Sequence, residues 1–155
     1  MKKRIIALGL LWCLSAVMLQ AARVDTVLVR SAAMNKDVKV VYVLPDKAIG
    51  KQACPVVYLL HGYGGNARSW VQLKPELPQM ADEKGIIFVC PDGKNSWYWD
   101  SPENPAYRYE TFVTSELVKY TDGNYATIPD RKARAISRLS MGGHGALWSA
   151  IRHKD

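Results

Sequence analysis

Residues 139–146, LSMGGHGA, decide the fold of this chain. They connect an expected short strand at 134–139 to an expected helix at 142–152, so that Ser140 lies in the sharp turn between the two. A serine in such a turn is lifted above the sheet edge on a strained backbone, and small neighbours allow the helix to pack back against the strand. The pattern predicts that Ser140 is a nucleophile.

A second glycine-rich stretch, residues 61–65 (HGYGG), follows a continuous apolar run at 56–60, which is typical of a strand buried on both faces. The backbone of such a loop can approach a ligand closely. Met141 begins the helix after the serine, where unpaired amides and the positive end of the helix dipole can stabilise an oxyanion. Together, the two stretches predict a nucleophile and the two halves of an oxyanion hole.

Segments typical of strands and of helices alternate along the chain. An initial pair of β-branched runs predicts two strands joined by a turn, and buried strands and helices then follow one another. This order predicts a three-layer α/β domain with a mainly parallel sheet. The expected strands are at residues 24–30, 38–44, 56–60, 86–89 and 134–139, and the expected helices are at 70–84, 110–120 and 142–152.

Several short motifs relate the chain to a known family: residues 61–65, 91–93 (PDG), 100–102 (DSP), 109–112 (YETF) and 140–147 (SMGGHGAL). Over nearly its whole length after the first 23 residues, the chain resembles the esterase D-like branch of the α/β-hydrolases. That branch includes S-formylglutathione hydrolases, tributyrin esterases, feruloyl and acetylxylan esterase domains, and mycolyltransferases.

The resemblance implies an α/β-hydrolase fold and hydrolysis of a small-molecule or carbohydrate-linked carboxylic ester through an acyl-enzyme on Ser140. It also implies that the backbone amides of Tyr63 and Met141 bind the oxyanion, and that no cofactor takes part. Acyl transfer to a sugar acceptor, as in the mycolyltransferases, is an alternative within the family.

The chain departs from the family pattern at two points. Arg138 stands where the motif G-x-S-x-G has its first glycine, and its long side chain predicts a distorted turn or a displaced helix. The catalytic acid and histidine of the family lie far downstream of the serine, whereas only fifteen residues follow Ser140 here. We therefore expect residues 22–155 to form only the amino-terminal part of the hydrolase fold, with impaired esterase activity.

The three histidines of the chain offer no evident substitute for a catalytic base. His61 follows a strand and is expected to brace the oxyanion loop, whereas His144 lies one turn along the helix that leaves the serine and is directed away from the pocket. His153 is thirteen residues beyond Ser140, about 20 Å along a helix. None of them forms a cluster with cysteine or acidic residues at ligand spacing, so we expect no metal site.

Three aromatic residues, Trp97, Tyr98 and Trp99, follow the second buried strand in a loop expected at the carboxyl edge of the sheet, beside the site. Their rings can stack on a sugar or an aromatic acyl group, or they can be buried under the loop. The sequence leaves both alternatives open. A non-catalytic protein that binds a glycan through these residues is therefore a further hypothesis.

The first 21 residues have the parts of a secretory signal peptide: the basic residues Lys2, Lys3 and Arg4, then an apolar run at 5–19, then small residues. An uncleaved membrane anchor is the alternative, but a fifteen-residue helix reaches only about 22 Å, short of a hydrocarbon core of about 30 Å. We expect a secreted or periplasmic protein with no stable membrane span after cleavage. Residues 22–155 would form its partial hydrolase domain.

The balance of basic and acidic residues indicates whether the chain is suited to bind nucleic acid. Lys and Arg number 21 against 14 Asp and Glu, and removing the three basic residues of the signal leaves 18 against 14, so we expect no nucleic-acid partner.

Export permits a disulfide between Cys54 and Cys90. On neighbouring parallel strands, however, these cysteines would lie about 15 Å apart, beyond the limit of about 7 Å between Cα atoms, so free thiols are expected.

Overall fold

A mixed sheet forms the centre of the computed structural model, which describes residues 22–154. Its strand order over these residues is β1-β2-β4-β3-β5. The hairpin strands β1 and β2 pair antiparallel, and β2 also pairs antiparallel with β4, whereas β3 pairs parallel with both β4 and β5. The strands are β1 (Arg23–Ser31), β2 (Lys36–Leu44), β3 (Val56–Leu60), β4 (Ile87–Pro91) and β5 (Arg134–Arg138).

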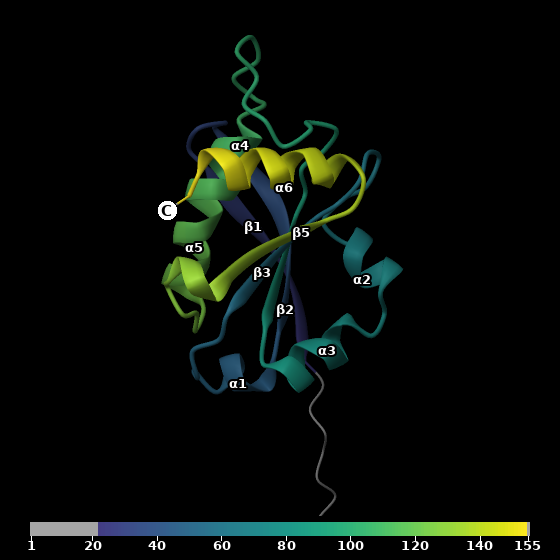
Figure 1. Ribbon diagram of the computed structural model, residues 1–155, viewed down its shortest axis with the longest axis vertical. Helices are drawn as coiled ribbons and strands as arrows, with labels where there is room; N and C mark the ends of the chain where they lie inside the picture. The colour runs from purple at the N-terminus through teal and green to yellow at the C-terminus, as the bar shows by residue number, and fades with distance from the viewer. Residues whose placement is uncertain (1–21, 155) are drawn as a thin grey trace, which may run out of the picture.

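Helices cover both faces of this sheet, which confirms the expected α/β layers. Figure 1 shows α2 and α3 on one side of the sheet and α5 on the other. The side chains of β2 alternate between two separate cores, with Val41 and Val43 on the α3 side and Val40 and Tyr42 on the side of α5 and α6. The helices are α1 (Asp46–Ile49), α2 (Ser69–Leu73), α3 (Leu77–Lys84), α4 (Tyr109–Thr111), α5 (Leu117–Asn124) and α6 (Met141–Arg152).

Two of the expected helices are interrupted in the structure. The segment expected at 70–84 divides into α2 and α3, because Pro75 and Pro78 cannot donate hydrogen bonds to a continuous helix, and α3 ends at Gly85 with a left-handed φ of 63°. The segment expected at 110–120 contains a π-helical turn, η1 (Phe112–Glu116), between α4 and α5. The sequence pattern therefore located both segments but missed their breaks.

Both described cysteines are buried free thiols, as expected. Cys54 lies two residues before the start of β3, while Cys90 lies near the end of the neighbouring parallel strand β4. Burial raises the pKa of the Cys90 thiol to about 12. Cys90 is consequently a packing residue with little thiolate character.

The expected signal peptide, residues 1–21, lies outside the part of the chain that the structure describes. Within residues 22–154, no helix is both long enough and apolar enough to cross a bilayer.

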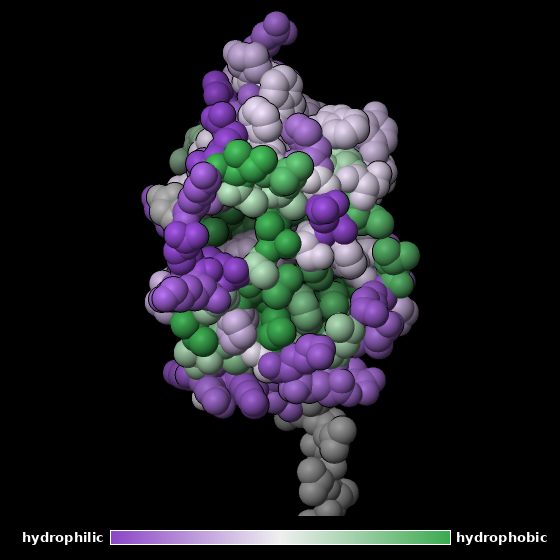
Figure 2. Space-filling view, viewed as in Figure 1, coloured by the Kyte–Doolittle hydropathy of each residue, from purple (hydrophilic) through white to green (hydrophobic). Residues whose placement is uncertain are grey.

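An apolar surface lies over β5 and the outer side of α6. In the described residues β5 pairs on one edge only, with β3, and the exposed side chains nearby include Leu139, Leu147 and Ile151. Figure 2 shows this surface as a green area that faces the viewer. An unpaired strand edge beside exposed apolar side chains is a site for self-association.

We therefore predict that the chain self-associates as its concentration rises, which light scattering coupled to size-exclusion chromatography would detect. A Leu147→Lys, Ile151→Lys double variant should shift the population toward monomer, because it places charges on the apolar surface. Leu73→Lys, an equally exposed position on α2, is the matched control and should leave association unchanged. A parent protein that stays monomeric at every concentration would contradict the prediction.

Candidate active site

Ser140 occupies the sharp strand-to-helix turn that the sequence predicts. One residue, Leu139, separates it from the end of β5, and α6 begins at the next residue, Met141. Its φ of 48° and ψ of −115° form a strained conformation for a residue with a side chain. The turn is closed by two hydrogen bonds, one of 2.9 Å from the Gly142 amide to the Leu139 carbonyl and one of 2.6 Å from the Gly143 amide to the Ser140 carbonyl.

Gly142 lets the first turn of α6 approach the end of β3. A Cβ at this position would lie 2.6 Å from the carbonyl oxygen of Leu60, a backbone atom that cannot move aside. The Leu60 carbonyl also accepts a 3.1 Å hydrogen bond from the Leu139 amide. Gly142, two residues after the serine, thus lets the turn pack closely against the neighbouring strand.

Arg138 does not distort this turn, contrary to the expectation from the sequence. Its side chain is exposed and lies along the first turn of α6, where a Cβ on Gly143 would be 3.1 Å from Nη1 of Arg138. The absence of a side chain on Gly143 leaves the room that Arg138 needs. Ser140 retains its strained conformation and α6 starts immediately after it.

The loop at residues 61–65 lies beside Ser140. A Cβ on Gly62 would be 3.3 Å from the Cβ of Ser140, so the structure brings the two glycine-rich stretches into contact. Gly65 donates a 3.0 Å hydrogen bond to the Gly62 carbonyl, and Gly64, with φ of 75°, donates to Oδ1 of Asn95. No hydrogen bond joins the amides of Tyr63 or Met141 to a described residue, which leaves both free to bind an oxyanion.

His61 braces this loop, as expected. Its ring is 1% exposed; Nδ1 lies 2.7 Å from the Gly62 carbonyl oxygen, and Nε2 accepts a 2.9 Å hydrogen bond from the Gly93 amide. Because a carbonyl only accepts and an amide N–H only donates, both contacts are hydrogen bonds when the ring carries its hydrogen on Nδ1. Both ring nitrogens are engaged, so His61 is not free to take a proton from Ser140.

Tyr98 is a core residue, so of the two alternatives that the sequence leaves open, burial is correct for this side chain and substrate binding is wrong. The side chain is fully buried and its hydroxyl accepts a 2.9 Å hydrogen bond from the His61 amide. Its side chain fills the space beside two glycines, where a Cβ on Gly93 would lie 2.2 Å from the ring and a Cβ on Gly145 would lie 2.4 Å from the Cβ of Tyr98 and 2.8 Å from the ring. Burial raises the pKa of this tyrosine far above its usual range.

Trp97 and Trp99, in contrast, remain exposed at 49% and 42%. The Trp97 carbonyl lies 2.7 Å from Nδ1 of His144, and the two rings meet edge to face with centroids 5.9 Å apart. His144 therefore has a packing role, as expected, but it packs against the aromatic loop, a contact that the sequence did not predict. A substrate-binding role for the two tryptophans remains a prediction.

Glu110 organises a cluster that the sequence analysis missed. Its buried carboxylate accepts hydrogen bonds from Nε1 of Trp148, Nε of Arg152 and Nε2 of His153, at 2.7, 2.7 and 2.9 Å. Burial favours the neutral acid, but these three donors outweigh it and hold the pKa of Glu110 below its usual value. The sequence marks Glu110 as part of the YETF motif, but it does not show the cluster, because only the fold brings α4 and α6 together.

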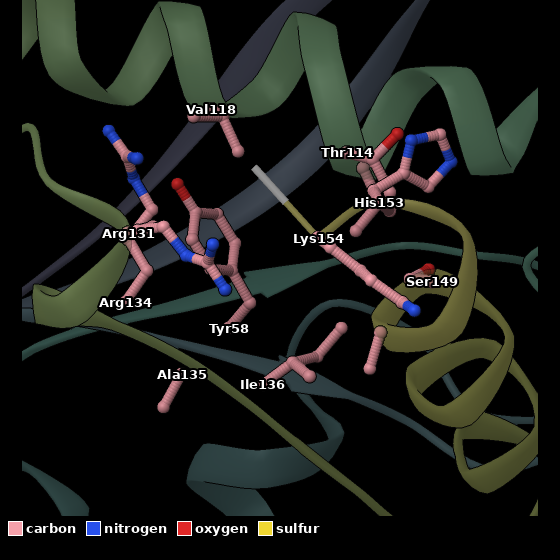
Figure 3. Close-up of a pocket in the computed structure, with 12 residues that line it drawn as sticks. Tyr58, Thr114, Val118, Arg131, Arg134, Ala135, Ile136, Ser149, His153 and Lys154 are labelled. Carbon is pink, nitrogen blue, oxygen red and sulfur yellow. The ribbon is translucent and has the colours of Figure 1, made fainter.

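The cavity in Figure 3 is separate from Ser140. It has a volume of about 300 Å³ and lies between β5, α5 and α6, with Arg131, Arg134 and Lys154 among the residues around it. Ser140 is not among its lining residues. Within residues 22–154, no group of three or more histidine, cysteine or acidic residues could hold a metal ion.

Tyr98→Phe should lower the free energy of unfolding by about 1–3 kcal/mol, because the buried His61 amide would lose its acceptor. Chemical denaturation followed by circular dichroism measures this change. Tyr63→Phe removes an exposed hydroxyl and serves as the control, with no change expected. If Tyr98→Phe were as stable as the parent, the hydrogen bond to His61 would not support the loop.

Comparison with known proteins agrees with this geometry. The family model named "Esterase" matches residues 31–155. An acetyl esterase from Caldicellulosiruptor saccharolyticus is 28% identical over 131 residues, which cover 79% of this chain and 48% of that protein. A diacylglycerol acyltransferase/mycolyltransferase Ag85A from Mycobacterium gordonae is 32% identical over 142 residues, with 85% of this chain and 40% of that protein covered.

A solved structure of an S-formylglutathione hydrolase from Agrobacterium tumefaciens superposes with a TM-score of 0.76 at 28% identity, covering 86% of this chain and 54% of the other. The chain spans about half the length of the curated relatives it matches, 48% of the acetyl esterase and 46% of a bovine S-formylglutathione hydrolase. By the family match and the shared fold, the chain belongs to the esterase family of α/β-hydrolases that includes the S-formylglutathione hydrolases and ferulic acid esterases.

Proposed function

We propose that the protein is a serine hydrolase of carboxylic esters, with Ser140 as the nucleophile. The observation that carries this proposal is the contact between the strained Ser140 turn and the Gly62 loop, which leaves the amides of Tyr63 and Met141 unbound on either side. Ser140 Oγ attacks the ester carbonyl, and the two amides stabilise the oxyanion. The alcohol leaves, and water then attacks the acyl-enzyme to release the acid.

The attack requires a base to accept the proton from Ser140. The three histidines of the chain are engaged elsewhere: His61 with Gly62 and Gly93, His144 with Trp97, and His153 with Glu110. No hydrogen bond to Ser140 Oγ is present among the described residues. We propose that residues 1–155 alone turn over esters slowly because they supply no general base.

The exposed Trp97 and Trp99 favour an ester with a flat or ring-shaped group, either a small molecule or an ester on a carbohydrate. Both rings lie on the loop that follows β4, and Trp97 contacts α6 one turn after Ser140 through His144. Flat aromatic surfaces bind rings through stacking and apolar contact.

Acyl transfer is the second candidate, favoured by the 32% identity to the mycolyltransferase. The first half of the reaction would be the same, and a sugar hydroxyl would replace water as the acceptor of the acyl group. Hydrolysis and transfer therefore differ only in the product formed from the acyl-enzyme.

We further propose that the protein is exported, on the basis of the basic start and apolar run within residues 1–21. Expression in a bacterial host should yield a mature protein that begins near residue 22, which amino-terminal sequencing of the periplasmic or secreted fraction would identify. Recovery of the uncut chain from the membrane fraction would instead indicate an anchor.

The chain should hydrolyse p-nitrophenyl acetate about 10²- to 10⁴-fold more slowly than a full-length esterase of the family, which is the rate contribution of a general base. Ser140→Ala should abolish the remaining activity, and Ser137→Ala, an exposed serine on β5, is the matched control. Repeating the assay with a sugar alcohol and identifying the products separates transfer from hydrolysis. Turnover equal to a full-length esterase would overturn the slow-turnover proposal, and activity retained in Ser140→Ala would overturn the nucleophile.

A further inference from the structure

The cavity of about 300 Å³ between β5, α5 and α6 has no part in the proposed reaction. Its size is at the lower end of the range for small-ligand sites. Ser149 lies in its wall, nine residues beyond Ser140, which is about 13 Å along α6. A ligand in this cavity would therefore occupy a site distinct from that of the nucleophile.

Basic side chains line this cavity, and acidic ones do not. Its basic residues are Arg131, Arg134, His153 and Lys154. Arg134 is paired with Asp122 and His153 with Glu110. Arg131, on the short 3-10 turn η2 (Arg131–Ala133), forms no ion pair with another described residue, and neither does Lys154. The cavity therefore carries positive charge that an anionic ligand would balance.

Three polar groups in the wall of the cavity are buried and have no hydrogen-bond partner among the described residues: the hydroxyls of Tyr58 and Ser149 and Nε of Arg134. Tyr58 and Ser149 are each only 5% exposed. The Tyr58 hydroxyl approaches that of Thr121, but the geometry between them is not that of a hydrogen bond. All three groups carry a hydrogen to donate, and a buried donor without an acceptor is destabilising. These groups therefore favour a ligand that accepts hydrogen bonds.

Two of the unpaired groups lie at the same end of the cavity as Arg131. Figure 3 shows the Tyr58 hydroxyl and the Arg134 side chain near Arg131, whereas Ser149 lies near Lys154 at the other end. The unpaired atoms of Tyr58 and Arg134 have almost no surface of their own open to solvent, so a ligand reaches them after a small shift of the side chains that cover them. The end formed by the two arginines thus combines positive charge with unpaired donors.

Aliphatic side chains form much of the remaining wall: Val113, Val118, Ala135, Ile136 and Ala150. A carboxylate ion accepts hydrogen bonds without donating any, so it suits both the unpaired donors and the positive charge. An aliphatic chain attached to the carboxylate would leave water when it packs against the valine and isoleucine side chains. Inorganic phosphate matches the charge but has no apolar part to contact this wall.

We propose that the cavity binds a medium-chain fatty acid as its carboxylate ion. The carboxylate lies at Arg131 and Arg134, and the aliphatic chain lies along Val118 and Ile136. Hydrolysis of an aliphatic ester releases an acid of this chemistry, but the inference does not rest on the proposed function, because Ser140 is not part of the cavity.

Isothermal titration with sodium octanoate tests the site, at a protein concentration where light scattering shows a monomer. Octanoate should bind, and 1-octanol, which has the same chain without the charge, should bind at least tenfold more weakly. Arg131→Gln should weaken octanoate binding about tenfold, because it removes a charged donor. Arg131 is exposed and makes no side-chain hydrogen bond to a described residue, so this variant should fold. Lys132→Gln, an exposed basic neighbour on η2 outside the cavity lining, is the matched control and should bind as the parent does.

Several outcomes would overturn the inference. Protein that circular dichroism shows to be folded could bind no octanoate, or could bind inorganic phosphate more tightly than octanoate. Equal affinity for octanol and octanoate would contradict a carboxylate site, and an equal loss in Arg131→Gln and Lys132→Gln would indicate a general attraction to positive charge. Octanoate binding should be unchanged in Ser140→Ala protein, whereas its loss there would place the ligand at the nucleophile. Octanoate binding without any Ser140-dependent ester hydrolysis would support the cavity and contradict the proposed function.

Discussion

The close packing of Tyr98 against Gly93 and Gly145 is the constraint on which the site depends. One ring contacts the loop after β4 and the first half of α6, and its hydroxyl is hydrogen-bonded to the amide of His61. Three segments that are distant in the sequence thus meet at a single buried side chain. A side chain on either glycine would occupy the space of the ring, so the glycines and the tyrosine depend on one another.

His61 extends this arrangement toward the reacting atoms. Its two ring nitrogens connect the carbonyl of Gly62 with the amide of Gly93, and the Gly62 backbone lies against Ser140. The strain at Ser140 is offset by this surrounding structure, which holds the turn from the β3 side through Leu60 and Gly142. The buried packing around Tyr98 and the position of Ser140, the proposed nucleophile, therefore belong to one network of contacts.

The sequence predicts those parts of the fold that follow from local patterns. The β-branched runs, the two glycine-rich turns and the free cysteines are found as expected. The sequence leaves open whether Tyr98 is buried or faces a ligand, because Trp97 and Tyr98 both have a left-handed φ of 56° and so lie outside any regular strand or helix whose period would separate buried from exposed positions. The Glu110 cluster and the room for Arg138 beside Gly143 arise only when distant segments pack together, and no local pattern encodes them.

The buried thiols of Cys54 and Cys90 have a consequence for how this protein is made. A chain that crosses a membrane unfolded must acquire its structure on the other side, and many exported domains wait there for oxidation before they are stable. Here, the cores on both faces of the sheet close around reduced sulfur, and Cys90 stays protonated across the physiological pH range. Under the proposed export, the described domain therefore needs no disulfide to hold its fold, and a reducing medium would break no bond within residues 22–154.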